Sequence, residues 1–142
     1  MRLLFFSIAL FLSSASFSQN VSDTIFIFIT DGFENDSVDL WINETHVLYN
    51  QNLKSNLYYG LTGEPIELIK DKNHYVVKCS NYANCSSNKI NLDSEIKIKL
   101  LFNERIYEEA FDLTKGKYFI IGYVGVYMDI DIWQLKFEPS FE

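Results

Sequence analysis

The segment 126–133 constrains the fold most, because two kinds of side chain alternate along it without interruption. In a β-strand, successive side chains point to opposite faces, so this alternation predicts a strand with two different surfaces. One surface is apolar and is expected to face a core; it consists of Val126, Met128, Ile130 and Ile132. The other places two carboxylates between two aromatic rings and is expected to face solvent; it consists of Tyr127, Asp129, Asp131 and Trp133.

The same two-residue period recurs along most of the chain, at intervals of about ten residues. The clearest second case is 37–43, where the apolar set is Val38, Leu40 and Ile42 and the other set is Asp39, Trp41 and Asn43. Further apolar or alternating runs between turn residues predict strands at 24–30, 46–49, 57–61, 66–70, 74–79, 89–92, 95–102 and 118–123. The segment 105–113 has a spacing compatible with a helix, but hairpin-type turns on both sides favour a strand there.

These runs predict an all-β protein, namely a single antiparallel β-sandwich of the jelly-roll or Ig-like type with about 9–10 strands. The run Thr24–Thr30 is apolar on both faces, which predicts a central strand that is covered on both sides. The hairpin built on Val38-Asp39-Leu40-Trp41-Ile42-Asn43 resembles the valine-x-leucine-tryptophan-x-asparagine hairpins of many jelly-roll and other β-sandwich modules. Over this short stretch, the resemblance also implies a sandwich.

The first eighteen residues have the order of a secretory signal peptide: Arg2, then an apolar run from Leu3 to Leu12, then small polar residues up to Ser18. We therefore expect cleavage before Gln19, one domain at 19–142, and a secreted product, extracellular or periplasmic. The alternative is an uncleaved anchor or a membrane-associated N-terminus. The apolar run is shorter than a bilayer span, so stable membrane insertion is not expected. The whole chain carries a net charge of −7, and Arg2 is the only charged residue before Gln19, so the mature domain is more acidic still. Such a charge disfavours nucleic acid as a partner.

The only two cysteines, Cys79 and Cys85, are six positions apart. In an exported chain, two cysteines are expected to form one disulfide, which here would close a small loop. A zinc site is a poor alternative because it needs about four ligands and neither histidine has a suitable spacing. The short separation also differs from the distant cysteines of an immunoglobulin domain.

Both tryptophans of the chain fall on the polar side of an alternating strand, which is unusual for the largest apolar side chain. Flat rings beside carboxylates and amides suit a sugar, which has an apolar C–H face and a rim of hydroxyls. We therefore expect a non-enzymatic binding module with a glycan, or else an extracellular protein, as its partner. The candidate ligand-binding residues are Tyr127, Asp129, Asp131, Trp133, Asp39, Trp41 and Asn43. A combined site requires the two stripes to share one face; otherwise, the rings are part of a packed surface, as in a structural or protein-interaction sandwich.

Catalytic and metal sites have little support in the sequence. His46 and His74 lie in expected strands, with no nucleophile motif or metal-binding histidine pair, and are expected to be packing or surface residues. Asp129 and Asp131 have the separation of any two such residues on one strand face, which does not identify a glycosidase. Oxygen ligands at Asp31, Glu34, Asn35, Asp36 and Asp39 could hold calcium, but the spacing matches no EF-hand and a solvated loop is the favoured interpretation. No metal, cofactor or catalytic residue is predicted.

Overall fold

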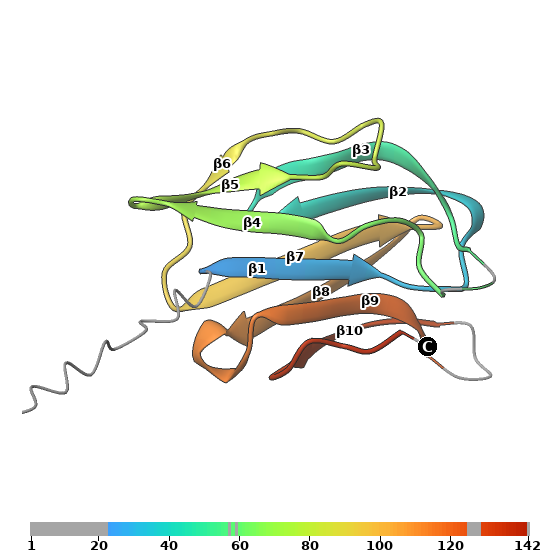
Figure 1. Ribbon diagram of the computed structural model, residues 1–142. Helices are drawn as coiled ribbons and strands as arrows, with labels where there is room; N and C mark the ends of the chain where they lie inside the picture. The colour runs from blue at the N-terminus through green and yellow to red at the C-terminus, as the bar shows by residue number, and fades with distance from the viewer. Residues whose placement is uncertain (1–22, 57, 59, 125–128, 142) are drawn as a thin grey trace, which may run out of the picture.

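The computed structural model describes residues 23–56, 58, 60–124 and 129–141, and it shows two β-sheets packed face to face (Figure 1). The six-stranded sheet has the order β10-β9-β1-β4-β5-β6 and the four-stranded sheet the order β3-β2-β7-β8. The strands of the first sheet are β1 (Thr24–Ile29), β4 (Ile66–Asp71), β5 (His74–Lys78), β6 (Lys89–Ile90), β9 (Tyr118–Val124) and β10 (Asp129–Leu135). Those of the second are β2 (Glu34–Ile42), β3 (Thr45–Lys54), β7 (Glu95–Phe102) and β8 (Arg105–Asp112), and a 3-10 turn, η1 (Leu113–Lys115), follows β8. The predicted all-β sandwich is confirmed.

Strand β1 lies inside the six-stranded sheet, as its two apolar faces predicted. It pairs antiparallel with β4 and parallel with β9, and the β1–β9 pair is an exception in a sandwich that is otherwise antiparallel. Ile25, Ile27 and Ile29 point into the core, whereas Phe28 on the opposite face is also buried, at 7% exposure. The strand is therefore covered on both sides.

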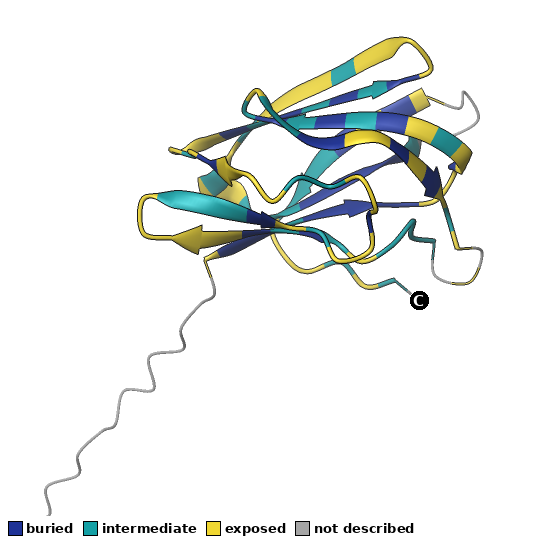
Figure 2. Ribbon diagram, turned by 90° about the horizontal axis from the view of Figure 1, so that it is seen from above, coloured by how far each residue is buried: buried dark blue, intermediate teal, exposed yellow. Residues whose placement is uncertain are grey.

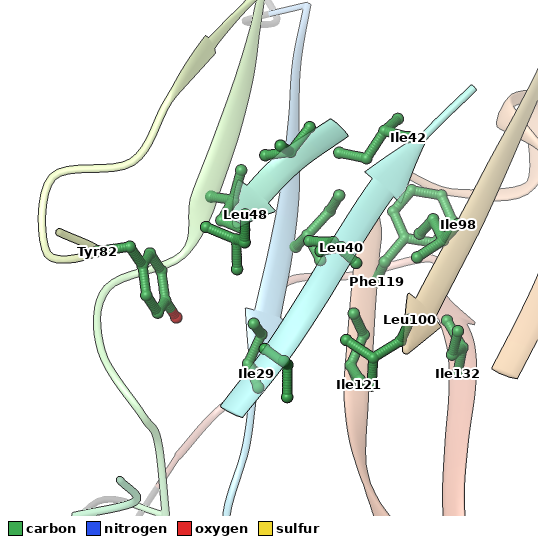
Figure 3. Packing of buried hydrophobic residues seen from close by; sticks show 14 of the residues in the cluster. Ile29, Leu40, Ile42, Leu48, Tyr82, Ile98, Leu100, Phe119, Ile121 and Ile132 are labelled. Atoms are coloured by element: carbon green, nitrogen blue, oxygen red, sulfur yellow. The ribbon is translucent and has the colours of Figure 1, made fainter. Parts of the chain in front are cut away.

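The core fills the space between the two sheets (Figure 3). Each inner face is built from every second residue of its strands, so that buried and exposed residues alternate along the ribbon (Figure 2). The β2 contribution is Val38, Leu40 and Ile42, and the β10 contribution is Ile130 and Ile132, as the alternation predicted. Val126 and Met128, the rest of that predicted stripe, lie outside the described residues.

Two hairpins of the four-stranded sheet turn through residues with positive φ. Asn43 and Glu44 join β2 to β3 at φ values of 44° and 64°, and Asn103 and Glu104 join β7 to β8 at 48° and 62°. Two consecutive residues in this region define the type I′ turn, whose twist matches that of the adjoining strands. The first of these turns sets the pairing of Trp41 with His46.

The predicted disulfide joins Cys79 to Cys85, and its loop lies along the edge of β3. The amide of Tyr49 donates to the carbonyl of Asn84 at 3.0 Å, and the amide of Ser86 donates to the carbonyl of Val47 at 2.9 Å. Inside the loop, Tyr82 inserts its ring into the core at 6% exposure (Figure 3). The loop thus covers part of an edge that would otherwise present unpaired backbone groups.

The segment 105–113 forms strand β8 up to Asp112, so the strand interpretation is confirmed over the helical one. The short strand expected at 57–61 is reduced, among its described residues, to a single bridge between Leu61 and Thr30. The described part of the chain contains no helix of the length and apolarity needed to span a bilayer.

Candidate functional site

The structure separates the two predicted stripes. Asp39, Trp41 and Asn43 belong to β2 in the four-stranded sheet and its following turn, whereas Asp129, Asp131 and Trp133 belong to β10 in the other sheet. The apolar neighbours of both stripes face the shared core, so the stripes themselves lie on opposite outer surfaces of the sandwich. Tyr127 lies outside the described residues. The combined site therefore divides into two separate halves.

In the β10 half, the two carboxylates bind the backbone of their own strand. Asp129 accepts a hydrogen bond from the amide of Ile130 at 3.1 Å, and Asp131 accepts one from the amide of Ile132 at 2.9 Å. Strand β10 is the last in its sheet, and an edge strand leaves every second amide without a strand partner. These interactions, together with the negative charge, make the edge a poor template for another strand.

Trp133 in the same half packs against neighbouring residues of its own sheet. It is half-buried and lies opposite Ile120 in the β9–β10 pair, with its ring beside Gly122. Ile120 is itself only 6% exposed although it lies on the outer side of the sheet. Trp133 thus belongs to an apolar surface that is partly covered.

In the β2 half, Trp41 belongs to a row of three rings. His46 on β3 stacks on Trp41 with ring centroids 4.3 Å apart and planes 14° apart, and Tyr49 follows His46 at 3.8 Å. On β7, the Nζ atom of Lys99 lies 4.8 Å from the centre of the Trp41 ring. We call Tyr49, His46 and Trp41 the aromatic row. Tyr49 at its end is 43% exposed, so the row offers an accessible ring at the side of the sheet.

Polar groups border the aromatic row. Asp39 Oδ1 lies 2.7 Å from Nε2 of His46 and also accepts a hydrogen bond from the amide of Asn50 at 3.1 Å. The side chain of Asn50 in turn accepts a hydrogen bond from the Ser37 hydroxyl. These contacts hold the imidazole in place and set hydroxyl, amide and carboxylate groups beside the rings.

The side-chain amide of Asn43, one of the candidate ligand-binding residues, makes two hydrogen bonds within the protein. Its Oδ1 accepts a hydrogen bond from the amide of Lys97 at 2.7 Å, and its Nδ2 donates to the carbonyl of Asn91 at 3.2 Å. Both ends of the amide are therefore used within the protein, where they attach the β2–β3 turn to neighbouring segments.

Three functional candidates at this face are missed by the sequence reasoning: His46 and Tyr49 in the aromatic row, and Lys99 beside it. The sequence alone predicts His46 to be a packing or surface residue. The Asn43-Glu44 turn is the signal that could have found His46, because a two-residue hairpin turn also pairs the second residue before it, Trp41, with the second residue after it. Irregular pairing between β2 and β3 near Leu40 moves Tyr49 out of simple alternation, which is why period two does not find it.

The expected oxygen-rich loop does not assemble a metal site. Asp39 turns toward His46, and Asp36 accepts a hydrogen bond from the amide of Glu34 at 2.7 Å. Among the described residues, no group of three or more histidine, cysteine, aspartate or glutamate side chains is positioned to hold a metal ion. The loop instead borders an open pocket of ≈ 480 Å³ whose lining includes Asp31, Glu34 and Lys54.

Fold and geometry together define a disulfide-bonded all-β sandwich with an aromatic, polar-bordered outer face on its smaller sheet. Comparison with models of protein families, with curated protein sequences and with solved structures finds no match. The two outer faces of the sandwich are therefore the features that bear on its function.

Proposed function

We propose that the protein is an exported, non-enzymatic module that binds carbohydrate through the aromatic row. The observation that carries this proposal is the exposed ring of Tyr49, which continues a stack of rings on an open sheet face. A pyranose would place its C–H face on Tyr49 and direct its hydroxyls to the carboxylate, amide and hydroxyl groups of Asp39, Asn50 and Ser37. Trp41 already contacts His46 and Lys99, so its contribution is to support the row.

The arrangement of the polar groups favours binding over catalysis. An Asp–His pair activates a nucleophile when a hydroxyl or thiol lies within hydrogen-bond reach of the histidine. Here Nε2 of His46 faces Asp39, and the nearby Ser37 hydroxyl donates to Asn50. The pair therefore fixes the orientation of a ring.

The binding proposal is tested by screening the mature chain on a glycan array and by titration calorimetry with any glycan that binds. Tyr49→Ala is expected to weaken binding at least tenfold, because loss of a stacking ring and its buried area removes about 1.5 kcal/mol or more. The matched control is Tyr58→Ala, since Tyr58 is 88% exposed and lies on the β3–β4 connection. A folded wild-type protein that binds no glycan, or a Tyr49→Ala variant with unchanged affinity, would contradict the proposal.

A protein partner is the second candidate, favoured by Ile106 on the same sheet face. Ile106 on β8 is 68% exposed and lies opposite Leu101, whose other neighbour is Asp39 on β2. An exposed isoleucine on the same sheet face as the aromatic row suits the apolar centre of a protein contact. Ile106→Glu is expected to abolish such a contact in a cross-linking assay with candidate partners while leaving glycan affinity unchanged.

Export has its own test. The mass of the protein recovered outside the cytoplasm should correspond to a chain that begins at Gln19. A product that retains Met1 to Ser18 in the membrane fraction would instead support the uncleaved anchor.

A further inference from the structure

The outer side of the six-stranded sheet carries a second aromatic surface, separate from the aromatic row. We call it the outer stripe, and it consists of Phe26, Phe28, Tyr118, Ile120 and Trp133. Strand pairing sets Phe26 beside Tyr118, and Phe28 beside Ile120 and then Trp133. The Phe26 and Tyr118 rings stack with centroids 5.6 Å apart and planes 10° apart. The outer stripe is therefore a continuous apolar band across β1, β9 and β10.

Part of the outer stripe is covered by the C-terminal tail of the chain. After β10 the tail turns back and ends near the end of β9 (Figure 1), where the ring of Phe141 lies 5.2 Å from that of Phe28. Phe28 and Ile120 are buried to 7% and 6% exposure, whereas Phe26, Tyr118 and Trp133 remain half-buried. The tail thus occupies one end of the stripe as an extended segment that adds no strand to the sheet.

A basic pocket adjoins the other end of the stripe. It has a volume of ≈ 290 Å³ and is lined by Leu113, Thr114, Lys115, Gly116, Lys117, Tyr118 and Lys136. Tyr118 belongs to both the pocket and the outer stripe. Three lysines line this small pocket in a chain whose net charge is −7. Because Lys117 is paired with Asp23 at 3.5 Å, the attraction of this end of the stripe for carboxylates rests mainly on Lys115 and Lys136.

We propose that the outer stripe and the basic pocket together form a docking site for a short, extended segment of a partner protein that carries aromatic and acidic residues. The chain's own tail, Phe-Glu-Pro-Ser-Phe-Glu, has this chemistry and is the resident occupant. The partner displaces the ring of Phe141 from Phe28, and its carboxylates bind the lysines of the pocket. This site is independent of the carbohydrate proposal because it lies on the opposite sheet.

Because the tail is covalently attached, it determines how tightly a partner must bind in order to displace it. A covalently linked segment acts at an effective concentration in the millimolar range, so even a weak contact keeps it in place. A partner must bind more tightly than the tail or be present at a higher local concentration. Removing the ring of Phe141 should therefore open the site without changing the sheet beneath it.

The test uses the full mature chain and, as its probe, a fluorescein-labelled peptide with the sequence of residues 136–142. Fluorescence anisotropy is expected to show the Phe141→Ala chain binding this peptide on the order of tenfold more tightly than wild type. Phe137→Ala is the matched control, because Phe137 lies in the same tail but is 73% exposed, and it should bind like wild type. A peptide that lacks the ring of Phe141 should bind to neither chain.

Charge reversal tests the basic pocket. Adding Lys115→Glu to Phe141→Ala should remove most of the gain in affinity, and raising the salt concentration should weaken peptide binding to the Phe141→Ala chain. Phe141→Leu provides a second opening variant if the alanine chain unfolds at the assay temperature. The proposal fails if both opened chains are folded and bind the peptide no better than wild type. It also fails if they self-associate instead, which would make a second copy the occupant, or if they bind the ring-less peptide equally well.

Discussion

The two outer faces of this sandwich arise from the same sequence pattern and have opposite properties. On β2, the aromatic side chain of the alternating strand joins a row that ends in an exposed tyrosine, with charged and amide groups around it. On β10, the equivalent tryptophan joins an apolar stripe that the chain covers in part with its own tail. Alternation therefore predicts which side chains share a face, whereas neighbouring strands and distant segments decide whether that face is open.

The largest expected difference between the two faces is in stability. Phe28→Ala should lower the free energy of unfolding by about 3 kcal/mol, because a buried ring is lost and a cavity is left. Tyr49→Ala should lower it by about 1 kcal/mol or less, since that ring is 43% exposed. Urea unfolding of the two variants measures both values. Equal losses would mean that the two faces are equally packed.

Loss of the disulfide should affect the four-stranded side selectively. The Cys79→Ala/Cys85→Ala variant is expected to be less stable by about 2 kcal/mol in the loop-entropy model. Hydrogen exchange of the Tyr49 and Ser86 amides should accelerate, because these bonds join the loop to β3. Exchange in β9 should change only as far as global stability does. Alkylation of the unreduced wild-type protein followed by mass spectrometry serves as the control, and should show no free thiol.

Gly122 provides a steric test of the six-stranded side. A Cβ atom at this position would collide with Oγ1 of Thr30 and touch the ring of Trp133. Gly122→Ala should therefore cost about 2 kcal/mol of stability through overpacking. Gly63→Ala is the matched control because its Cβ would meet only ordinary contacts at 3.5 Å. A neutral Gly122→Ala would show that Thr30 and Trp133 move aside freely.

The smallest expected effects are changes in folding stability with pH, which have opposite directions for one ion pair on each sheet. The hydrogen bond and charge of Lys70 hold the pKa of Asp23, at the start of β1, below its usual value. The contribution of the Asp23–Lys70 pair to folding stability is therefore present above about pH 4 and is lost as pH falls through the lowered pKa of the folded state. On β7, the hydrogen bond with Glu108 raises the pKa of Lys97. That contribution is present below about pH 10.4 and is lost as pH rises through the raised folded pKa.

The urea midpoints of two variants measure these contributions. The difference between wild type and Asp23→Asn should shrink from neutral pH to about pH 3, and the difference between wild type and Lys97→Gln should shrink from neutral pH to about pH 11. Glu64→Gln, which alters an exposed carboxylate, is the control. Because all of these groups are solvent-exposed, the changes should be small and should decrease further with added salt. Pairs that contribute nothing would give differences independent of pH.

Much of the fold could be predicted because burial and alternation are local. The strand faces of 37–43, 95–102 and 129–133, the central position of β1 and the disulfide all follow from residue order and spacing. The site could be predicted only in part. Trp41 and Asp39 lie on one face as expected, and the local β2–β3 turn pairs His46 with Trp41. Lys99, in contrast, comes from β7, whose register with β2 the sequence does not encode locally.

The covering of Phe28 could not be predicted for a related reason. It depends on Phe141, near the end of the described chain, returning over a sheet whose central strand begins at Thr24. No periodic signal marks residues 136–141, and Pro139 indicates only that the last strand has ended. Long-range coverage of this kind is decided by which apolar surface is left after the sheets have paired.

The parallel pairing of β1 with β9 has a consequence for the order of folding. Phe26 to Ile29 lie near the start of the chain, yet one of their two neighbouring strands, Tyr118 to Ile121, comes about ninety residues later. A nascent chain that ends before Tyr118 would leave one whole side of its central strand without backbone partners. Contacts so distant in sequence slow the folding of a small domain, often to milliseconds or seconds. The sandwich can therefore close only after nearly all of its chain has been made.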